Sequence, residues 1–349
     1  MTTHPALRST LEFAPTDDPR WVALVESTED ATPFHHPAWS RLIERCYGYR
    51  SFVLAERGAN GTIRGGLPIV EVPGLIRGRR WISVPFADHC APLGSFTDPE
   101  TLPRRLALAR GNAGISSLEV RAALAGAGVH RESHWVRHVL RLRSDPDAQF
   151  RTFHRMTRRN VRQAERSGLV VRERGDVDAV TEIFYALHVD TRRRLGVPVQ
   201  PRRFFRLLWE ELVAAGLGFV LIAEAGSKPV AGAVFLRWNG NTIYKFGASD
   251  PEAWHARPNN LLFWHAIQRS IERRDRSLDF GRSELDQEGL RVFKAGWGAE
   301  EEPLVYSHVA EQAPGPAVRR ASELLAPAIR RSPRWVTRLL GELLYRHAA

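Results

Sequence analysis

The sequence contains very little cysteine and very little lysine. Cys46 and Cys90 are the only cysteines among its 349 residues, and a lone pair of this kind is typical of a reducing compartment such as the cytoplasm. Neither a CxxC pair nor the Cys/His spacing of a zinc site occurs, so we expect no metal. Of the 50 basic residues, the only lysines are Lys228, Lys245 and Lys294. Because arginine serves almost everywhere else, these three lysines are candidates for a specific chemical role.

Long apolar runs are missing as well. No segment approaches the roughly 20 apolar residues that a membrane-spanning helix needs, and the first residues lack the apolar core of a signal peptide. Hydrophobic residues nevertheless make up 43% of the chain and aromatic residues 9%, which is sufficient for a packed core. We therefore expect a globular cytoplasmic protein with room for two domains.

The balance of charges is strongly positive, at +11 with histidine neutral. Such a charge favours an anionic partner, which could be tRNA, a nucleotide-linked substrate or an acidic membrane surface. A solvated basic surface explains the charge equally well, because arginine is frequent throughout the chain.

The hydrophobic pattern of the first half predicts a mixture of strands and helices. A turn and helix-cap signal at residues 144–147 marks the expected domain boundary. The predicted strands cover residues 7–14, 51–57, 62–72, 81–85, 117–122 and 135–142, and the predicted helices cover 19–29, 37–47 and 102–110.

The pattern of the second half is clearer. Its predicted helices cover 148–167, 176–195, 201–215, 258–274 and 289–295, and its predicted strands cover 218–225, 229–238, 241–248, 277–281 and 304–309. This order indicates an α+β fold, a mixed α/β sheet with helices on its faces. The first half follows roughly the same order, which suggests a weak structural repeat. We expect an N-terminal domain over 1–145, a catalytic domain over 146–312 and a basic helical tail over 313–349.

The tail alternates arginines with apolar residues at helical spacing, and Ser332–Pro333 interrupts the pattern. It could lie on an anionic membrane at the inner face, beside a lipid-linked acceptor. Docking on the enzyme is the alternative that we favour. The residues concerned are Trp335, Val336, Leu339, Leu340, Leu343 and Leu344, with Arg330, Arg331, Arg334 and Arg338 among them.

Five segments together resemble a known family. They are FHHPAWSRLIERCYGYR (34–50), SVPFADHCAPLG (83–94), RRNVRQAERSGLVVR (158–172), YKFGAS (244–249) and LDFGRS…GLRVFKAGWG (278–298). They resemble the FemAB-like acyltransferases, which are related to the Fem peptidyltransferases, over about residues 10–310. The resemblance implies two GNAT-like domains in tandem and N-acyl transfer. In the best-understood members the donor is aminoacyl-tRNA and the acceptor is an amine of a peptidoglycan precursor.

Acyl transfer requires a neutral amine close to the acyl carbon, a stabilised oxyanion and a route for one proton. Lys294 is the candidate cation for the oxyanion; the resemblance implies this role and contact with the tRNA acceptor end. A lysine that snorkels at a helix end is the alternative. Asp279, in a strand that we expect to be buried, orients a donor group or Arg282, or caps backbone amides. Tyr244 donates a proton to the leaving group or packs in the core.

The substrate-binding candidates surround these catalytic candidates or lie in a loop of the first half. Lys245 follows Tyr244 on one strand, so alternation points the two side chains to opposite faces. For the loop of the first half, the resemblance implies that its acidic residue lies near the acceptor. The candidates are Arg282, Ser283, Phe293 and Lys245 in the second half and Asp88 and His89 in the first.

The phosphate-binding turn of CoA-dependent GNAT enzymes is missing. Family members that use CoA carry a glycine-rich turn whose amides hold the pyrophosphate at a helix N-terminus. Here the stretch reads WHARPNN, in which Arg257 is present and Pro258 removes a backbone donor. The side-chain amides of Asn259 and Asn260 remain as possible ligands. This departure from a CoA site favours the Fem-like branch, whose members use tRNA or a donor that is not established.

An arginine stripe after the domain boundary is a candidate surface for an anionic partner. If residues 148–167 form one helix, its arginines lie on one face, although a solvated helix face is an equal alternative. The stripe consists of Arg151, Arg155, Arg158, Arg162 and Arg166.

These observations lead to three functional hypotheses, none of which requires a tightly bound cofactor. The leading one is transfer of an aminoacyl or acyl group, from aminoacyl-tRNA or acyl-CoA, to an amine of a cell-envelope or exopolysaccharide precursor that is nucleotide- or lipid-linked. The second is an acetyl-CoA-dependent N-acetyltransferase that acts on an amino sugar or small amine. The third is a non-catalytic RNA-binding protein on this fold, for which no stacking motif is evident.

Overall fold

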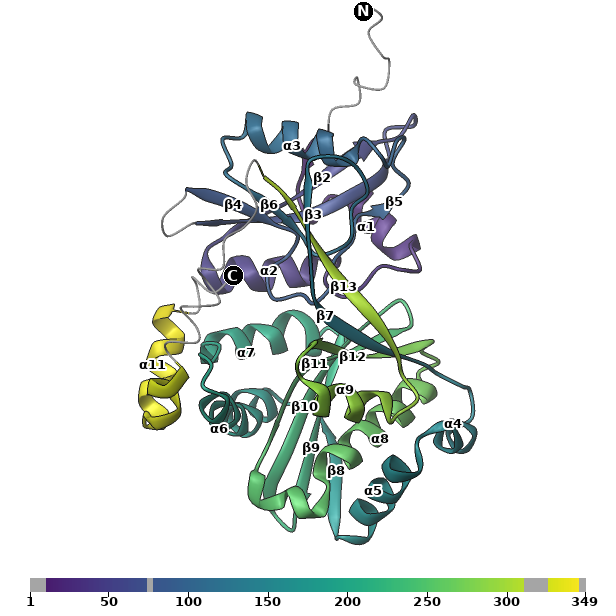
Figure 1. The fold of residues 1–349 in the computed structure, drawn as a ribbon, viewed down its shortest axis with the longest axis vertical. Helices are drawn as coiled ribbons and strands as arrows, with labels where there is room; N and C mark the ends of the chain where they lie inside the picture. The colour runs from purple at the N-terminus through teal and green to yellow at the C-terminus, as the bar shows by residue number, and fades with distance from the viewer. Residues whose placement is uncertain (1–10, 74–77, 311–325, 345–349) are drawn as a thin grey trace, which may run out of the picture. The chain divides into compact units, whose positions relative to one another are not determined.

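The computed structural model describes residues 11–73, 78–310 and 326–344, and it divides into two compact units. The first comprises the chain up to Trp135 and a segment that begins at Pro303; the second comprises Val136–Glu302 and the C-terminal helix. The division therefore falls inside two long strands, β7 (Val129–Arg141) and β13 (Glu300–Val309) (Figure 1). It differs from the division expected at residue 145, because β7 continues without a break past the point where the units separate.

The first unit is a mixed sheet with helices. Its described elements are β1 (Glu12–Ala14), α1 (Pro19–Ser27), α2 (Pro37–Tyr47), β2 (Arg50–Arg57), β3 (Ile63–Pro73), β4 (Arg79–Ile82), β5 (Leu93–Gly94), α3 (Leu102–Asn112) and β6 (Leu118–Val120). The sheet order is β1-β2-β3-β4-β6-β13, and only the β4–β6 pair is parallel. Local signals explain α2, since the His36 side chain caps its first turn and Gly48 ends it in the left-handed conformation.

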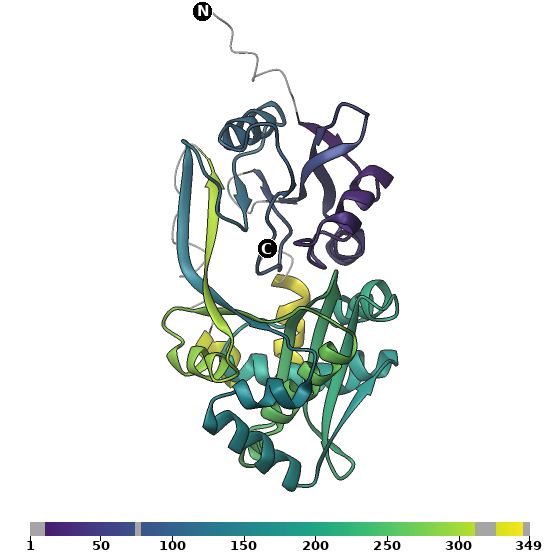
Figure 2. The same cartoon turned by 90° about the vertical axis from the view of Figure 1, so that its right-hand side faces the viewer.

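The second unit is likewise a mixed sheet with helices. Its elements are α4 (Pro146–Thr152), α5 (Arg155–Arg166), β8 (Leu169–Arg174), η2 (Ala179–Phe184), α6 (Tyr185–Leu195), α7 (Arg202–Leu208), η3 (Trp209–Val213), β9 (Gly218–Ala225), β10 (Lys228–Trp238), β11 (Asn241–Ser249), η4 (Pro251–Ala256), α8 (Pro258–Glu272), β12 (Ser277–Glu284), α9 (Glu288–Ala295) and α11 (Arg334–Leu344). The order is β7-β12-β11-β10-β9-β8. Helices α5 and α8 cover one face, and α6 and α7 cover the other (Figures 1 and 2).

Both units follow the same order of elements. Each runs strand, helix, helix, three antiparallel strands, helix and a further strand that pairs in parallel with the third. In the first unit the parallel pair is β4–β6, and in the second it is β11–β12. The mixed α/β fold and the repeat expected from the sequence are therefore confirmed.

Several predicted elements differ in detail. The helix expected over 148–167 is interrupted at Phe153 and His154, because Phe153 is buried and the His154 amide donates to the Gly296 carbonyl, 2.8 Å away. Strand β8 is not among the predicted strands. It lies at the edge of the sheet, and Leu169 is its one buried residue, so its sequence shows little of the apolar pattern of a strand. Residues 7–10 of the first predicted strand lie outside the described residues.

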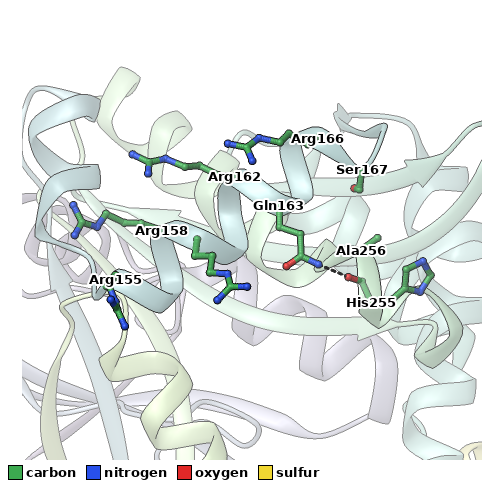
Figure 3. Close-up of a pocket in the computed structure, with 9 residues that line it drawn as sticks. Arg155, Arg158, Arg162, Gln163, Arg166, Ser167, His255 and Ala256 are labelled. Atoms are coloured by element: carbon green, nitrogen blue, oxygen red, sulfur yellow. Dashed lines mark hydrogen bonds between the residues drawn. The ribbon is translucent and has the colours of Figure 1, made fainter.

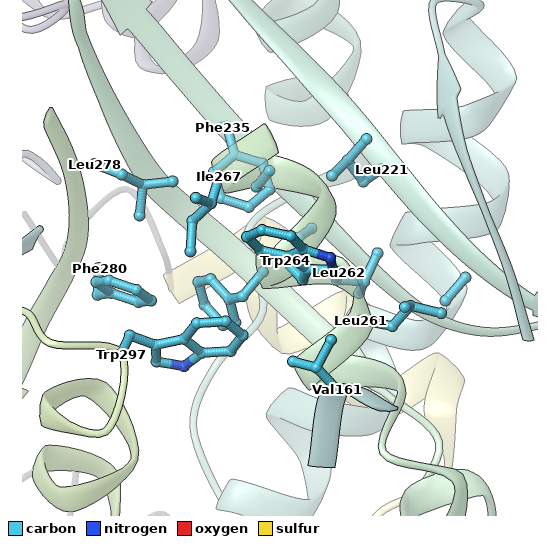
Figure 4. Close-up of a cluster of buried hydrophobic side chains, with 14 of the residues drawn as sticks. Val161, Leu221, Phe235, Leu261, Leu262, Trp264, Ile267, Leu278, Phe280 and Trp297 are labelled. Atoms are coloured by element: carbon cyan, nitrogen blue, oxygen red, sulfur yellow. The ribbon is translucent and has the colours of Figure 1, made fainter. Parts of the chain in front are cut away.

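The core of the second unit lies between its sheet and α8 (Figure 4). Phe235 of β10, Trp264 of α8, Phe280 of β12 and Trp297 after α9 belong to one buried cluster. The ring centroids of Phe280 and Trp297 lie 6.1 Å apart. Buried aromatic side chains of this size contribute a large share of core stability, so the cluster fixes β12 and the end of α9 relative to α8.

Candidate functional site

The strands β11 and β12 separate soon after they begin. Their parallel register covers Asn241–Ile243 against Ser277–Asp279 and goes no further. The β10–β11 register shifts at the same level, because Phe235 lies opposite Tyr244 whereas Val234 lies opposite Phe246. Lys245 is therefore the extra residue of a β-bulge, which bends β11 away from β12. In open α/β sheets, ligands commonly bind outside the carboxyl ends of the strands, and this is the end at which β11 and β12 separate.

Strand β12 is itself kinked at Gly281. This glycine has φ of 72°, in the left-handed region that disfavours side chains, and its amide donates to Asp279 Oδ1 at 2.7 Å. Asp279 Oδ2 lies 3.7 Å from the guanidinium of Arg137. Asp279 thus caps a neighbouring backbone amide, which is one of the two roles that the sequence left open.

Lys294 of α9 is tied to this kink. Its side chain is only 2% exposed, and Nζ donates to the carbonyls of Gly281 at 2.7 Å and Arg282 at 3.1 Å. Carbonyls of adjacent residues point to opposite sides of a regular strand. The left-handed Gly281 therefore allows one ammonium to bind both carbonyls, and it brings positive charge to the diverging end of β12.

Replacing Gly281 with alanine is expected to lower the free energy of unfolding by about 1–2 kcal/mol, because a Cβ is unfavourable in the left-handed region. Urea unfolding measures the effect. Gly289→Ala in α9 is the matched control: a Cβ there meets no atom within 4 Å, and alanine favours helix. Equal effects of the two substitutions would contradict the importance of the kink.

The rest of the FKAGWG motif fixes the position of α9. Phe293 packs against the buried cluster of the second unit, and Trp297 is fully buried in it. A Cβ at Gly296 would lie 2.7 Å from Thr157 Oγ1 of α5, so any other residue here would force Thr157 or one of the two helices to move. The residues of this motif therefore hold α5, α9 and β12 together.

His138 is a further candidate that the sequence analysis missed. It is completely buried, and its Nε2 lies 3.1 Å from Glu301 Oε2. Burial is the main cause that lowers the pKa of His138, with the charge of Lys294 the next. Period-two alternation places His138 on the buried face of β7 with Val136 and Leu140, and a histidine among such residues was the signal available.

Ser283 and Tyr244 complete the surroundings of the diverging strands. Ser283 is buried, and its hydroxyl has no hydrogen-bond partner among the described residues. The Tyr244 ring packs against Phe235 and Phe263, and burial raises the pKa of Tyr244 to about 12. Tyr244 therefore carries its proton at neutral pH. The ammonium of the next residue, Lys245, lies 5.4 Å from the centre of the Phe246 ring.

A cavity of about 830 Å³ lies between α5 and η4. Arginines of α5 line one side of the cavity (Figure 3). Gln163, also on α5, donates a hydrogen bond from its side-chain amide to the His255 carbonyl of η4 at 2.9 Å. In the described part of the chain, no carboxylate forms an ion pair with these arginines. The arginines are Arg155, Arg158, Arg159, Arg162 and Arg166.

The cavity corrects the expected arginine stripe. Because the helix breaks at Phe153–His154, Arg151 lies on α4, where its guanidinium is 3.8 Å from Asp145. Arg159, which the stripe omitted, lines the cavity instead. Arg155, Arg158, Arg162 and Arg166 are all brought together there.

Comparison with known proteins identifies this region. A family model described as an acetyltransferase (GNAT) domain matches residues 151–302. This segment is therefore similar to a GNAT acetyltransferase domain. The protein is therefore an acyltransferase, in agreement with the resemblance seen in its motifs. A search of curated protein sequences finds no match to the chain.

Solved structures share the fold over most of the chain at low sequence identity. FemX has a TM-score of 0.63 and 14% identity, covering 82% of this chain and 94% of its own. A tandem GNAT protein from the clavulanic acid biosynthesis pathway has a TM-score of 0.54 and 16% identity, covering 87% and 99%. The C-terminal domain of a protein described as a lysylphosphatidylglycerol synthetase, from Agrobacterium fabrum, has a TM-score of 0.53 and 14% identity, covering 89% and 94%.

The turn that precedes α8 in the acetyltransferase domain differs from a phosphate cradle of backbone amides. Arg257 occupies the left-handed region with φ of 60°, and Pro258 begins the helix. The Asn259 side-chain amide donates to Ser249 Oγ at 3.3 Å, and Asn260 is buried. Arg257 is exposed in this turn.

The first unit of the acyltransferase carries a strained loop after β4. Val84 and Phe86 have φ of 65° and 64°, and non-glycine residues in this region are typical of functional loops. Asp88 and His89 lie half-exposed on it. The Asp88 carbonyl accepts a hydrogen bond from the Tyr306 hydroxyl at 2.9 Å, so the loop is held in place in spite of its strain.

The described residues of the acyltransferase contain neither a cluster of metal ligands nor a membrane-spanning helix. Among residues 11–73, 78–310 and 326–344, no three His, Cys, Asp or Glu side chains gather as metal ligands. No helix in these ranges is long and apolar enough to cross a membrane.

Proposed function

We propose that this acyltransferase moves an aminoacyl group from aminoacyl-tRNA to an amine of a cell-envelope precursor. One observation carries the proposal: the cavity between α5 and η4 presents five arginines whose charges no described carboxylate neutralises. Elsewhere in the domain arginines are commonly paired, as Arg237 with Asp275 and Arg269 with Glu173. An unneutralised row of guanidiniums favours a phosphate-rich ligand.

The length of the row favours a polynucleotide over CoA. From Arg155 to Arg166 a helix rises about 16 Å, which exceeds the extent of one pyrophosphate. The turn before α8 also lacks the glycine-rich amides of a CoA site. Two residues of η4, His255 and Ala256, line the cavity, and η4 follows directly in the chain on β11, the strand that separates from β12.

The chemistry would take place beside the β11 bulge. The acceptor amine attacks the acyl carbonyl carbon, a C–N bond forms, and the bond from carbon to the donor oxygen breaks. Lys294 supplies positive charge for the oxyanion. Tyr244, protonated at neutral pH, gives its proton to the leaving oxygen and regains one from the amine. Asp279 and the kinked β12 position Lys294.

The loop after β4 in the first unit is a candidate of its own for binding polar groups. Asp88 and His89, on the strained loop, are suited to hold an amine or its neighbouring polar groups. One structural relative is named for the synthesis of lysylphosphatidylglycerol, which makes a lipid-linked acceptor as reasonable as a nucleotide-linked one. Exopolysaccharide precursors with free amines belong to the same class.

A transfer assay tests the proposal. The full chain is incubated with radiolabelled aminoacyl-tRNA or acetyl-CoA and with amine acceptors linked to a nucleotide or a lipid. Transfer from aminoacyl-tRNA supports the proposal. Transfer from acetyl-CoA alone would make the protein an N-acetyltransferase of a small amine or amino sugar. Binding of uncharged RNA without any turnover would indicate a non-catalytic RNA-binding protein.

Charge reversal in the cavity is expected to weaken donor binding. The double variant Arg158→Glu/Arg162→Glu should lower tRNA affinity at least tenfold and reduce the slope of log affinity against log salt by about 2, since each phosphate contact contributes roughly 1. Filter binding across a salt series measures both. Arg206→Glu, on the exposed side of α7, is the matched control. An unchanged salt slope in the double variant would exclude the cavity as the phosphate site.

A further inference from the structure

Helix α11 packs on α6 through one of its faces. Arg334 Nε lies 2.6 Å from Asp190 Oδ1, and Thr337 is fully buried. A Cβ at Gly341 would lie 2.2 Å from the Val199 carbonyl oxygen. The three contact residues lie within one sector of the helix, so the tail docks on the second unit (Figure 1).

The opposite face of α11 is apolar and exposed. Trp335 is 66% exposed and Leu339 51%, and their spacing of four residues places them side by side on the helix. Trp335 is the most exposed of the large hydrophobic side chains in the described part of the chain. Docking on α6 therefore leaves a second, outward face that the folded unit does not cover.

Basic residues are frequent in and just before α11, where Arg334 pairs with Asp190 and Arg338 lies over the Tyr185 ring on the docked side. Residues 330–342 hold four arginines and a single carboxylate, Glu342. Arg331 is exposed, and Arg330 contacts the carbonyl of Leu195 at 3.4 Å. Tryptophan and leucine flanked by arginines are typical of helices that lie in the interface of an anionic bilayer.

We propose that the outward face of α11 binds an anionic membrane surface. Trp335 and Leu339 enter the interfacial region, and Arg330 and Arg331 meet lipid headgroups. Docking of the other face on α6 then holds the second unit at the membrane. This inference does not depend on the proposed donor or acceptor, because it concerns binding without turnover.

Co-sedimentation of the full chain with vesicles tests the inference. Vesicles of phosphatidylcholine containing phosphatidylglycerol are compared with vesicles of phosphatidylcholine alone. We expect binding to the anionic vesicles only, and a loss of at least tenfold in partitioning for Trp335→Ala/Leu339→Ala. Arg330→Glu/Arg331→Glu should lose binding in the same way, and 0.5 M salt should weaken the wild type.

Matched controls show whether the effect belongs to α11 or to any exposed leucine or arginine. Leu108→Ala removes an equally exposed leucine from α3, and Arg104→Glu reverses an exposed charge on the same helix; both should bind like the wild type. Thermal unfolding verifies that the variants fold. Unchanged vesicle binding by Trp335→Ala/Leu339→Ala would overturn the inference. A dimer that forms without lipid and that this variant abolishes in sedimentation would also overturn it, because a second copy of the chain would then cover the outward face.

Discussion

Replacing Lys294 with alanine is expected to lower kcat for acyl transfer by about two to three orders of magnitude, the usual cost of removing one group that stabilises an oxyanion. The same substitution removes a buried donor from the carbonyls of Gly281 and Arg282. It should therefore also lower the free energy of unfolding, by about 2–4 kcal/mol. Initial rates at saturating donor and urea unfolding measure the two effects separately.

Two comparisons decide what Lys294 contributes. Lys228→Ala removes an exposed lysine that pairs with Asp250 at 3.0 Å, and it should leave kcat unchanged. Gly281→Ala disturbs the same carbonyls but keeps the ammonium. If Lys294→Ala lowers kcat no more than Gly281→Ala does, Lys294 is a structural anchor and the oxyanion role is wrong. A fall in kcat that greatly exceeds that of Gly281→Ala supports the electrostatic role.

The elements around the site could be predicted from the sequence because each carries a local signal. Residues 277–281 are an apolar run after a long helix, and residues 289–295 have helical spacing; both predictions agree with β12 and α9 to within a few residues. The break at His154 could not be predicted in this way. Its cause is a hydrogen bond to the Gly296 carbonyl, which is distant in the sequence, and periodicity describes only one element at a time.

The same limit applies to the site. The sequence singled out Lys294, Asp279 and Ser283 from their motif, and the structure brings all three to β12 or its contacts. It missed the bulge at Lys245, which is visible only in the register between β10 and β11. It also extended the arginine stripe to Arg151, because helical spacing continues across a break that only tertiary contacts create.

Acid is expected to destabilise the second unit through His188. This residue is 3% exposed, and its Nε2 lies 2.9 Å from Gln200 Oε1. Among the described residues, its Nδ1 has no hydrogen-bond partner, so a proton there would be buried without an acceptor. Burial, assisted by the charge of Arg192, lowers the pKa of His188 to about 3.

The direction of the effect follows from proton linkage. Below a pH of about 6.5 the unfolded chain protonates this histidine while the folded chain does not, so stability is complete at neutral pH and declines as the pH falls towards 3. At pH 5 the loss from His188 alone is about 2 kcal/mol. His188→Gln retains an amide that can donate to Gln200 but does not titrate, so the decline between pH 7 and pH 5 should shrink by that amount in urea unfolding. His255→Gln, at an exposed position, is the control, and an equal decline in wild type and His188→Gln would show that His188 is not the group responsible.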